Sequence, residues 1–182
     1  MKNFKLLAAL FTCAFISTNA IAQTKMVGGA AMYPTKNIVE NAVNSKDHTT
    51  LVAAVKAAGL VETLQSAGPF TVFAPVNKAF DALPEGTVAM LLEPENKSKL
   101  TKVLTYHVVQ GKLSGMDLMK MVKDSNGKAT LKTVEGQEIY ITMKGKNVMI
   151  TDGNGGVAHI TIADVNQSNG VIHVIDKVLL PK

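Results

Sequence analysis

The stretch GPFTVFAPVNKAF occupies residues 68–80, and the stretch NGVIHVIDKVLLP occupies residues 169–181 near the end of the chain. Both are rich in β-branched and aromatic residues and are punctuated by glycine and proline, a pattern typical of buried strands with fixed ends. Neither stretch contains a known catalytic motif. We therefore predict that the two segments pair inside one shared core and that the protein is a packed, non-enzymatic module.

The hydrophobic periodicity changes along the chain. Helices are expected near residues 38–43, 47–58, 60–64, 77–83, 87–92, 95–105 and 114–122, with a first strand at 70–76 and an extended segment at 106–109. From residue 124 the period becomes two, and strands are expected near 129–134, 138–144, 146–151, 157–165 and 171–180. Helices gathered early and strands gathered late indicate an α+β fold.

The N-terminal segment is typical of an export signal. Lys2 and Lys5 precede an apolar run at residues 6–16, and the small residues at positions 20–22 provide a cleavage site. The apolar run is too short to span a bilayer as a helix, so we expect no stable membrane insertion after cleavage. A lipid anchor on Cys13 is the rival interpretation. Export predicts a periplasmic or extracellular protein, with association to the envelope left open.

The chain divides into an expected signal peptide at residues 1–22, a flexible leader at 23–34 and a folded domain at 35–182. The only cysteine leaves with the signal peptide, so no disulfide or zinc–thiolate site is expected. Loss of two lysines with the signal lowers the formal charge from +5 to +3, and all 19 basic residues are lysine. Since nucleic-acid readers rely on arginine forks, nucleic-acid binding is not expected.

Three boxes along the chain resemble those of the fasciclin domain family, a secreted and cell-surface module. They are TVFAP at residues 71–75 with Asn77 and AF at 79–80, YHVV at 106–109, and SNGVIHVID at 168–176. The similarity covers nearly all of residues 35–182, and a single domain behind a signal peptide is similar to the bacterial members. The resemblance implies a twisted β-wedge with helices packed along one side, and a role in cell adhesion or matrix contact.

The resemblance also marks four candidates for partner binding, which are Tyr106, His107, Asp164 and Val165. The family's Tyr-His region is tied to partner binding, and the Asp164-Val165 pair is similar to an integrin-contacting motif of animal members. An exposed carboxylate can complete a metal site on such a receptor. Structural roles are nevertheless favoured: a buried neutral imidazole for His107, and a turn or backbone acceptor for Asp164.

Five residues of the boxes are expected to hold the fold together: Thr71, Asn77, His107, His173 and Asp176. Asn77 is expected to cap the short helix that follows it. If Asp176 is buried, its expected partner is Thr71 or Asn77 of the first box.

No metal site and no cofactor are expected. The segment DGNGG at residues 152–156 lacks the glycine spacing and the bidentate glutamate of a calcium loop, and it predicts a tight turn. Met116, Met119 and Met121 carry thioether groups that suit Cu(I), but core packing is favoured.

The remaining chemistry-bearing residues form no recognisable constellation. His48, His159 and His173 have no ligand-like spacing. The catalytic motifs Gly-x-Ser-x-Gly and His-Glu-x-x-His are absent from the sequence.

The sequence therefore predicts a secreted, non-enzymatic recognition module that contacts a cell-surface or matrix protein or polysaccharide. The alternative is a periplasmic carrier of a small apolar ligand, held between the helices and the sheet. A pocket with convergent polar groups would favour the carrier, and a filled core with flat exposed patches would favour adhesion. An enzyme acting on polysaccharide would need paired carboxylates across a cleft, and no such pair is apparent.

Overall fold

The computed structural model describes residues 24–182, so the expected signal peptide at residues 1–22 lies outside the described residues. The helices are α1 (Ile38–Ala42), η1 (Lys46–His48), α2 (Thr49–Ala58), α3 (Val61–Gln65), α4 (Asn77–Asp81), α5 (Thr87–Leu92), η2 (Pro94–Asn96), α6 (Lys97–Tyr106) and α7 (Gly115–Asp124). The strands are β1 (Lys25–Val27), β2 (Ala30–Met32), β3 (Phe70–Pro75), β4 (Val108–Gln110), β5 (Lys128–Lys132), β6 (Glu138–Lys144), β7 (Asn147–Thr151), β8 (Val157–Gln167) and β9 (Gly170–Ile175).

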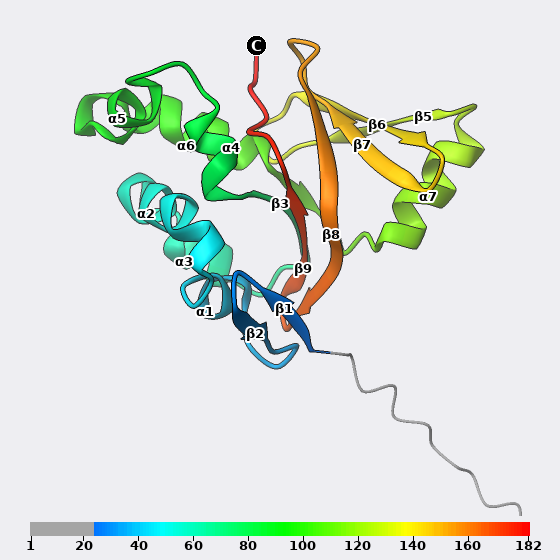
Figure 1. Ribbon diagram of the computed structural model, residues 1–182, viewed down its shortest axis with the longest axis horizontal. Coiled ribbons are helices and arrows are strands. Elements are labelled where there is room, and N and C mark those ends of the chain that lie inside the picture. The colour runs from blue at the N-terminus through cyan, green and yellow to red at the C-terminus, as the bar shows by residue number, and fades with distance from the viewer. Residues whose placement is uncertain (1–23) are drawn as a thin grey trace, which may run out of the picture.

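The main sheet has seven strands in the order β4-β3-β9-β8-β7-β6-β5. Strands β3 and β9 are parallel, and the other neighbours are antiparallel. An isolated bridge between Val109 and Thr133 brings the two ends of the sheet together, so that the sheet is nearly a barrel. In Figure 1, helices α1–α6 gather on one side of β3 and β9, whereas β5–β7 and α7 lie on the other. The predicted α+β wedge with helices along one side is confirmed.

The stretches at residues 68–80 and 169–181 contain β3 and β9, which lie side by side at the centre of the sheet. Their register runs from Phe70 opposite Gly170 to Pro75 opposite Ile175. A Cβ atom on Gly170 would lie 2.1 Å from the carbonyl oxygen of Phe70, so only glycine lets the two strands begin this close together. The predicted pairing of the two segments is therefore confirmed.

Side chains alternate across β3 and β9 and so divide the interior into two cores. Val72, Ala74, Ile172 and Val174 belong to what we call the helical core, which they share with residues of α1–α4 and α6. Phe73 and Ile175 face the opposite way. They join the strand core, which contains buried apolar residues of α7 and β5–β7, Ala158 of β8, and Tyr106, Val109 and Leu179.

The leader differs from its expectation. Residues 25–32 form the β1–β2 hairpin, with Lys25 opposite Met32, instead of a flexible segment. Val27 and Met32 are buried in the helical core, and Lys25 donates a hydrogen bond of 2.5 Å to the carbonyl oxygen of Ala163. Two buried apolar side chains and this long-range bond hold the hairpin on the domain, which explains why the prediction was wrong here.

Several element ends also differ from the pattern-based bounds. Ser114 and Asp117 form the predicted capping box of α7. Tyr106, expected in an extended segment, is the last residue of α6. Strand β9 ends at Ile175 rather than near Leu180, because the chain bends at residues 176–177; Leu179, beyond the bend, is buried in the strand core.

Candidate functional site

Tyr106 lies inside the protein and has no exposed surface. Its hydroxyl donates to the carbonyl of Glu138 at 2.8 Å and accepts from the amide of Gly153 at 2.9 Å. Burial raises the pKa of this hydroxyl, so it is neutral at physiological pH. The side chain ties the end of α6 to two strand connections and presents nothing to a partner.

His107 is only 3% exposed, and both ring nitrogens are used. Nδ1 lies 2.7 Å from the carbonyl oxygen of Val103, and Nε2 accepts from the amide of Leu179 at 2.9 Å. Since Nε2 accepts, the proton is on Nδ1. Burial lowers the pKa of His107 to about 4, although the Val103 carbonyl and the charge of Asp152 oppose the shift. The imidazole is therefore buried and neutral, and it links α6 to the C-terminal segment.

Asp164 occupies an irregular part of β8, where the register with β9 shifts. Its φ of +56° is in the left-handed region that aspartate tolerates better than most residues. Its Oδ1 accepts from the amide of Gly115 at 2.7 Å, at the first turn of α7. A carboxylate there also interacts favourably with the helix dipole. Asp164 is half-buried and Val165 is 1% exposed, so nearly all of the exposed surface of the pair belongs to Asp164.

Thr71 and His173 join β3 and β9 to the segment before α7. The Thr71 hydroxyl donates to Gly111 O at 2.7 Å and accepts from the amide of Leu113 at 2.9 Å. His173 Nε2 lies 2.8 Å from the carbonyl oxygen of Leu113, and burial lowers the pKa of this histidine. Both residues are fully buried and position the start of α7.

Asn77 does not cap its own helix. Its Oδ1 accepts from the amide of Thr50 at 3.1 Å, and its Nδ2 donates to Lys46 O at 2.8 Å. It therefore satisfies the free N-terminal amides of α2 from outside that helix, while the N-cap of α4 is Val76. The side chain fixes the position of α2 against the end of β3.

Asp176 binds neither Thr71 nor Asn77. Its Oδ1 accepts from the His159 amide at 2.7 Å, and its Oδ2 lies 3.0 Å from His159 Nδ1. Both side chains are partly exposed. Thr71 or Asn77 was expected as its partner only if Asp176 were buried, and that condition is not met, because Asp176 is a partly exposed polar residue just after the end of β9.

Two further expectations concern metal ligands. Asp152 accepts from the amides of Asn154, Gly156 and Leu180, which makes residues 152–156 the predicted tight turn. Met119 and Met121 pack against the strand core, but Met116 is 75% exposed and was wrongly expected to be buried. Among residues 24–182, no group of three or more His, Cys, Asp or Glu side chains has the geometry of a metal site.

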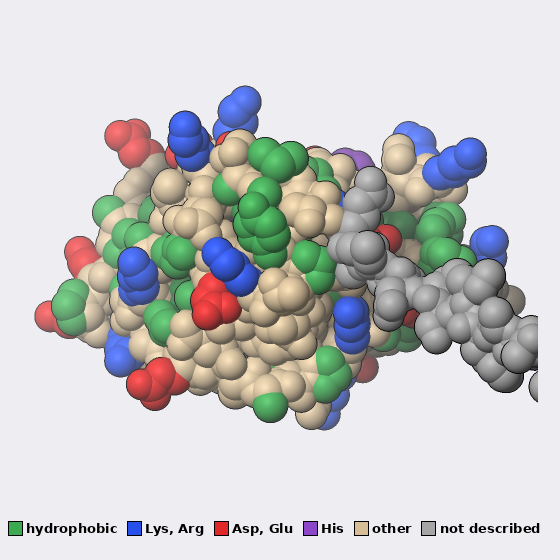
Figure 2. All heavy atoms as spheres, turned by 90° about the horizontal axis from the view of Figure 1, so that it is seen from below, with side chains coloured by type: hydrophobic (Ala, Val, Ile, Leu, Met, Phe, Trp, Pro, Cys, Tyr) green, Lys and Arg blue, Asp and Glu red, His purple; other side chains and the backbone are tan. Residues whose placement is uncertain are grey.

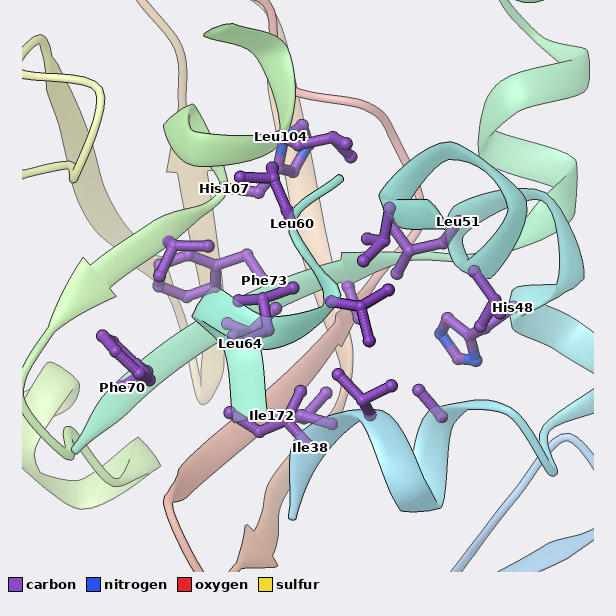
Figure 3. A pocket seen from close by; sticks show the side chains of 18 of the residues that line it. Ile38, His48, Leu51, Leu60, Leu64, Phe70, Phe73, Leu104, His107 and Ile172 are labelled. Atoms are coloured by element: carbon purple, nitrogen blue, oxygen red, sulfur yellow. The ribbon is translucent and has the colours of Figure 1, made fainter. Parts of the chain in front are cut away.

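A cavity of about 80 Å³ lies between the helices and β3 within the helical core. Figure 3 shows aliphatic and aromatic side chains from α1, α2, α3, β3 and β9 converging on it. Val39, Leu60 and Phe70 are partly exposed members of the lining. Lys56 is the one charged residue of the lining, and its side chain belongs to the exposed face of α2.

His48 lines one wall of this cavity and is 3% exposed. Its Nδ1 lies 2.8 Å from Ser45 Oγ, whereas its Nε2 has no hydrogen-bond partner. Burial lowers the pKa of His48; the backbone of Ala74 opposes the shift without reaching hydrogen-bonding geometry with Nε2. A buried imidazole nitrogen left unpaired costs free energy, which makes His48 the polar group to account for here.

Sequence reasoning offered a pocket between the helices and the sheet only as an alternative, and it considered His48 only as a metal ligand. The available signal was the spacing of Ser45 and His48, since residues three apart share one side of a helical turn. Asn169 was also missed: it accepts from the amide of Ile38 and donates to the carbonyls of Leu64 and Ser66, joining α1 to α3.

The geometry defines a class of protein in which helices flank a nearly closed sheet. The polar residues of its sequence boxes form hydrogen bonds inside the protein. The family model of the fasciclin domain matches residues 46–181. The chain belongs to the fasciclin domain family.

Known proteins with similar sequences or folds come from bacteria and animals. Protein sll1483 of Synechocystis sp. is 44% identical over 170 residues, covering 93% of this chain and 87% of that protein. Immunogenic protein MPB70 of Mycobacterium bovis is 36% identical, covering 77% and 66% respectively. The FAS1 domain pair from the insect cell adhesion molecule fasciclin I has a TM-score of 0.71 and 20% identity, covering 80% of this chain and 51% of that one. That structural likeness shows the fold.

Proposed function

We propose that the protein is an exported, non-enzymatic recognition module that contacts a cell-surface or matrix protein or polysaccharide. Membership of the fasciclin domain family is the observation that carries this proposal. One solved structure of the same fold is a domain pair from an insect cell adhesion molecule. No helix within residues 24–182 is long and apolar enough to cross a membrane.

The arrangement of polar residues supports the proposal. Tyr106, His107, Thr71 and His173 are saturated by internal hydrogen bonds, so none of them is available as a reactive group at the surface. In Figure 2, one face carries interspersed lysine and acidic side chains with hydrophobic groups between them. A mixed surface of this kind suits contact with protein or polysaccharide better than with a strongly charged polymer.

Asp164 is the sharpest residue with which to test this proposal. The variant Asp164→Asn keeps an oxygen for the Gly115 amide and suits the left-handed backbone, but it removes the charge. We expect this variant to fold like the wild type and to bind intact cells or envelope fractions several-fold more weakly. Asp124→Asn, at the other end of α7, is the matched control and should bind like the wild type.

Two outcomes would count against the proposal in different ways. Binding of Asp164→Asn at wild-type strength would limit Asp164 to its role at the start of α7. Absence of any binding by the wild-type mature protein at micromolar concentrations would remove the adhesion proposal itself.

The cavity in the helical core favours a second function, that of a carrier of a small apolar ligand. Its lining is almost wholly apolar, it has partly exposed residues at its edge, and it contains one unpaired polar atom. These are the features of a small-molecule site. Titration with 2-methyl-1-butene, a slender hydrocarbon, should shift the methyl resonances of Val55, Leu104 and Ile172. Unchanged resonances would exclude this function.

A further inference from the structure

The unpaired nitrogen of His48 gives the cavity a chemical preference. His48 and Ser45 are both buried, and their side chains bond to each other through Nδ1 and Oγ. Figure 3 shows the His48 imidazole among the apolar side chains that line the cavity. Its Nε2 is the only buried side-chain nitrogen or oxygen of residues 24–182 that lacks a hydrogen-bond partner.

The hydrogen-bond pattern assigns the proton of His48. The Ser45 hydroxyl makes no other side-chain bond within the described part of the chain, so its proton is satisfied when it donates to Nδ1. A neutral imidazole that accepts at Nδ1 carries its proton on Nε2. The free atom is therefore a donor, and it requires an acceptor.

A water molecule is a poor candidate for that acceptor. Buried water needs two to four polar partners, and it is stable only where a site supplies them. Among the polar side chains of the lining, Ser45 and His48 bond to each other, His107 and Thr105 bond to backbone groups, and Lys56 and Thr63 are exposed. Nε2 itself offers a water molecule only one bond. An acceptor oxygen attached to an apolar body would satisfy Nε2 and fill the hollow at the same time.

We propose that the cavity binds a slender apolar molecule whose buried end carries a carbonyl or hydroxyl oxygen, which accepts a hydrogen bond from His48 Nε2. This inference rests on the carrier function proposed above and names the chemical class of its ligand. The volume of about 80 Å³ is roughly half that of an engineered apolar cavity that admits benzene, so it suits an alkyl segment better than a ring.

Two probes of matched shape test the inference. Butanone and 2-methyl-1-butene differ in having C=O or C=CH₂ at the same position. We expect both to shift the cavity methyl resonances of the wild type. In His48→Phe the ratio of ketone affinity to alkene affinity should fall about tenfold, because the hydrogen-bond donor is lost. His48→Gln, which keeps an N–H group, should restore part of the preference.

His159→Phe is the matched control, since His159 lies outside the cavity and bonds to Asp176. Its ratio of ketone to alkene affinity should equal that of the wild type. The Nε2–H resonance of His48 in the unaltered protein gives a readout that needs no variant: butanone should shift it much more than the alkene does.

The outcomes separate the two proposals. If neither probe binds, the carrier function and the inference fall together. If both bind, but the affinity ratio is the same in His48→Phe and the Nε2–H resonance responds equally to both, the carrier function stands and the role of His48 is overturned. Neither result bears on adhesion.

Discussion

The two cores on opposite faces of β3 and β9 differ in how completely they are filled. In the strand core, Ile139, Ile141 and Ile150 have no exposed surface, and the hydroxyl of Tyr106 has two partners. The helical core contains the cavity and the unpaired His48 nitrogen. At about 24 cal/mol per Å³ a hollow of this size costs about 2 kcal/mol. The well-packed strand core thus offsets the cost of the cavity in the helical core.

Matched isoleucine truncations should give the largest difference in stability between the two cores. We expect Ile141→Ala in the strand core to lower the free energy of unfolding by about 4 kcal/mol, within the range for buried truncations. Ile172→Ala should cost less, about 2–3 kcal/mol, because that side chain already borders a hollow and loses fewer contacts. Urea unfolding of both variants measures the difference. Equal losses would show that the two cores are equally well packed.

The pH dependence of stability tests the three buried histidines. Burial holds the pKa values of His48, His107 and His173 below 6.5 in the folded state, with that of His107 at about 4. The unfolded chain therefore binds more protons between those values. Stability should be fully present above pH 6.5 and fall as the pH drops towards 4, by about 3 kcal/mol for His107 alone.

Urea midpoints between pH 7 and pH 5 isolate this effect, because ordinary carboxylates are still ionised there. The slope should be reduced in His107→Asn, which removes one of the three titrating groups. A flat profile for the wild type would mean that these imidazoles are hydrated or already charged in the folded protein.

The hydroxyl of Tyr106 offers a smaller perturbation of the strand core. Tyr106→Phe leaves the Glu138 carbonyl and the Gly153 amide without their side-chain partner, and it should cost about 1–3 kcal/mol. Differential scanning calorimetry measures the change. Tyr140→Phe is the control, because its hydroxyl makes only an exposed contact with Glu138. A Tyr106→Phe variant as stable as the wild type would contradict the assigned hydrogen bonds.

Asn77 gives the smallest measurable change, on the helical side. Asn77→Ala should cost about 1 kcal/mol, as expected for loss of a side chain that caps a helix. The exposed pair of Lys120 and Asp124 provides a reference, and Lys120→Ala should not change stability measurably. If Asn77→Ala behaves like the reference, the cap across α2 contributes nothing.

The central pairing of β3 and β9 and the capping box of α7 were predictable, because they depend on local patterns of β-branched residues, glycine and caps. The hairpin of β1 and β2 was not, since so short an element depends on tertiary contacts, namely the burial of Val27 and Met32 and the bond from Lys25 to Ala163. Periodicity placed Tyr106 in an extended segment instead of at the end of α6, and it does not show which distant groups the hydroxyl reaches.

The volume and the lining of the cavity could not be predicted for a related reason. A hollow depends on how side chains from α1, α2, β3 and β9 fill the space between them, and no local pattern records that sum. The unpaired state of His48 is equally a property of the assembled core. The role of Asn77 was mistaken because its side chain was assigned to the helix that follows it, whereas it bonds to the start of the distant helix α2.

Methyl NMR under xenon pressure compares the two cores most directly, because xenon enters empty apolar cavities. We predict shifts for Leu51, Val55 and Ile172 around the hollow, and none for Ile139, Ile141 and Ile150 in the strand core. Shifts in both sets, or in neither, would contradict the account of one filled core and one hollow one.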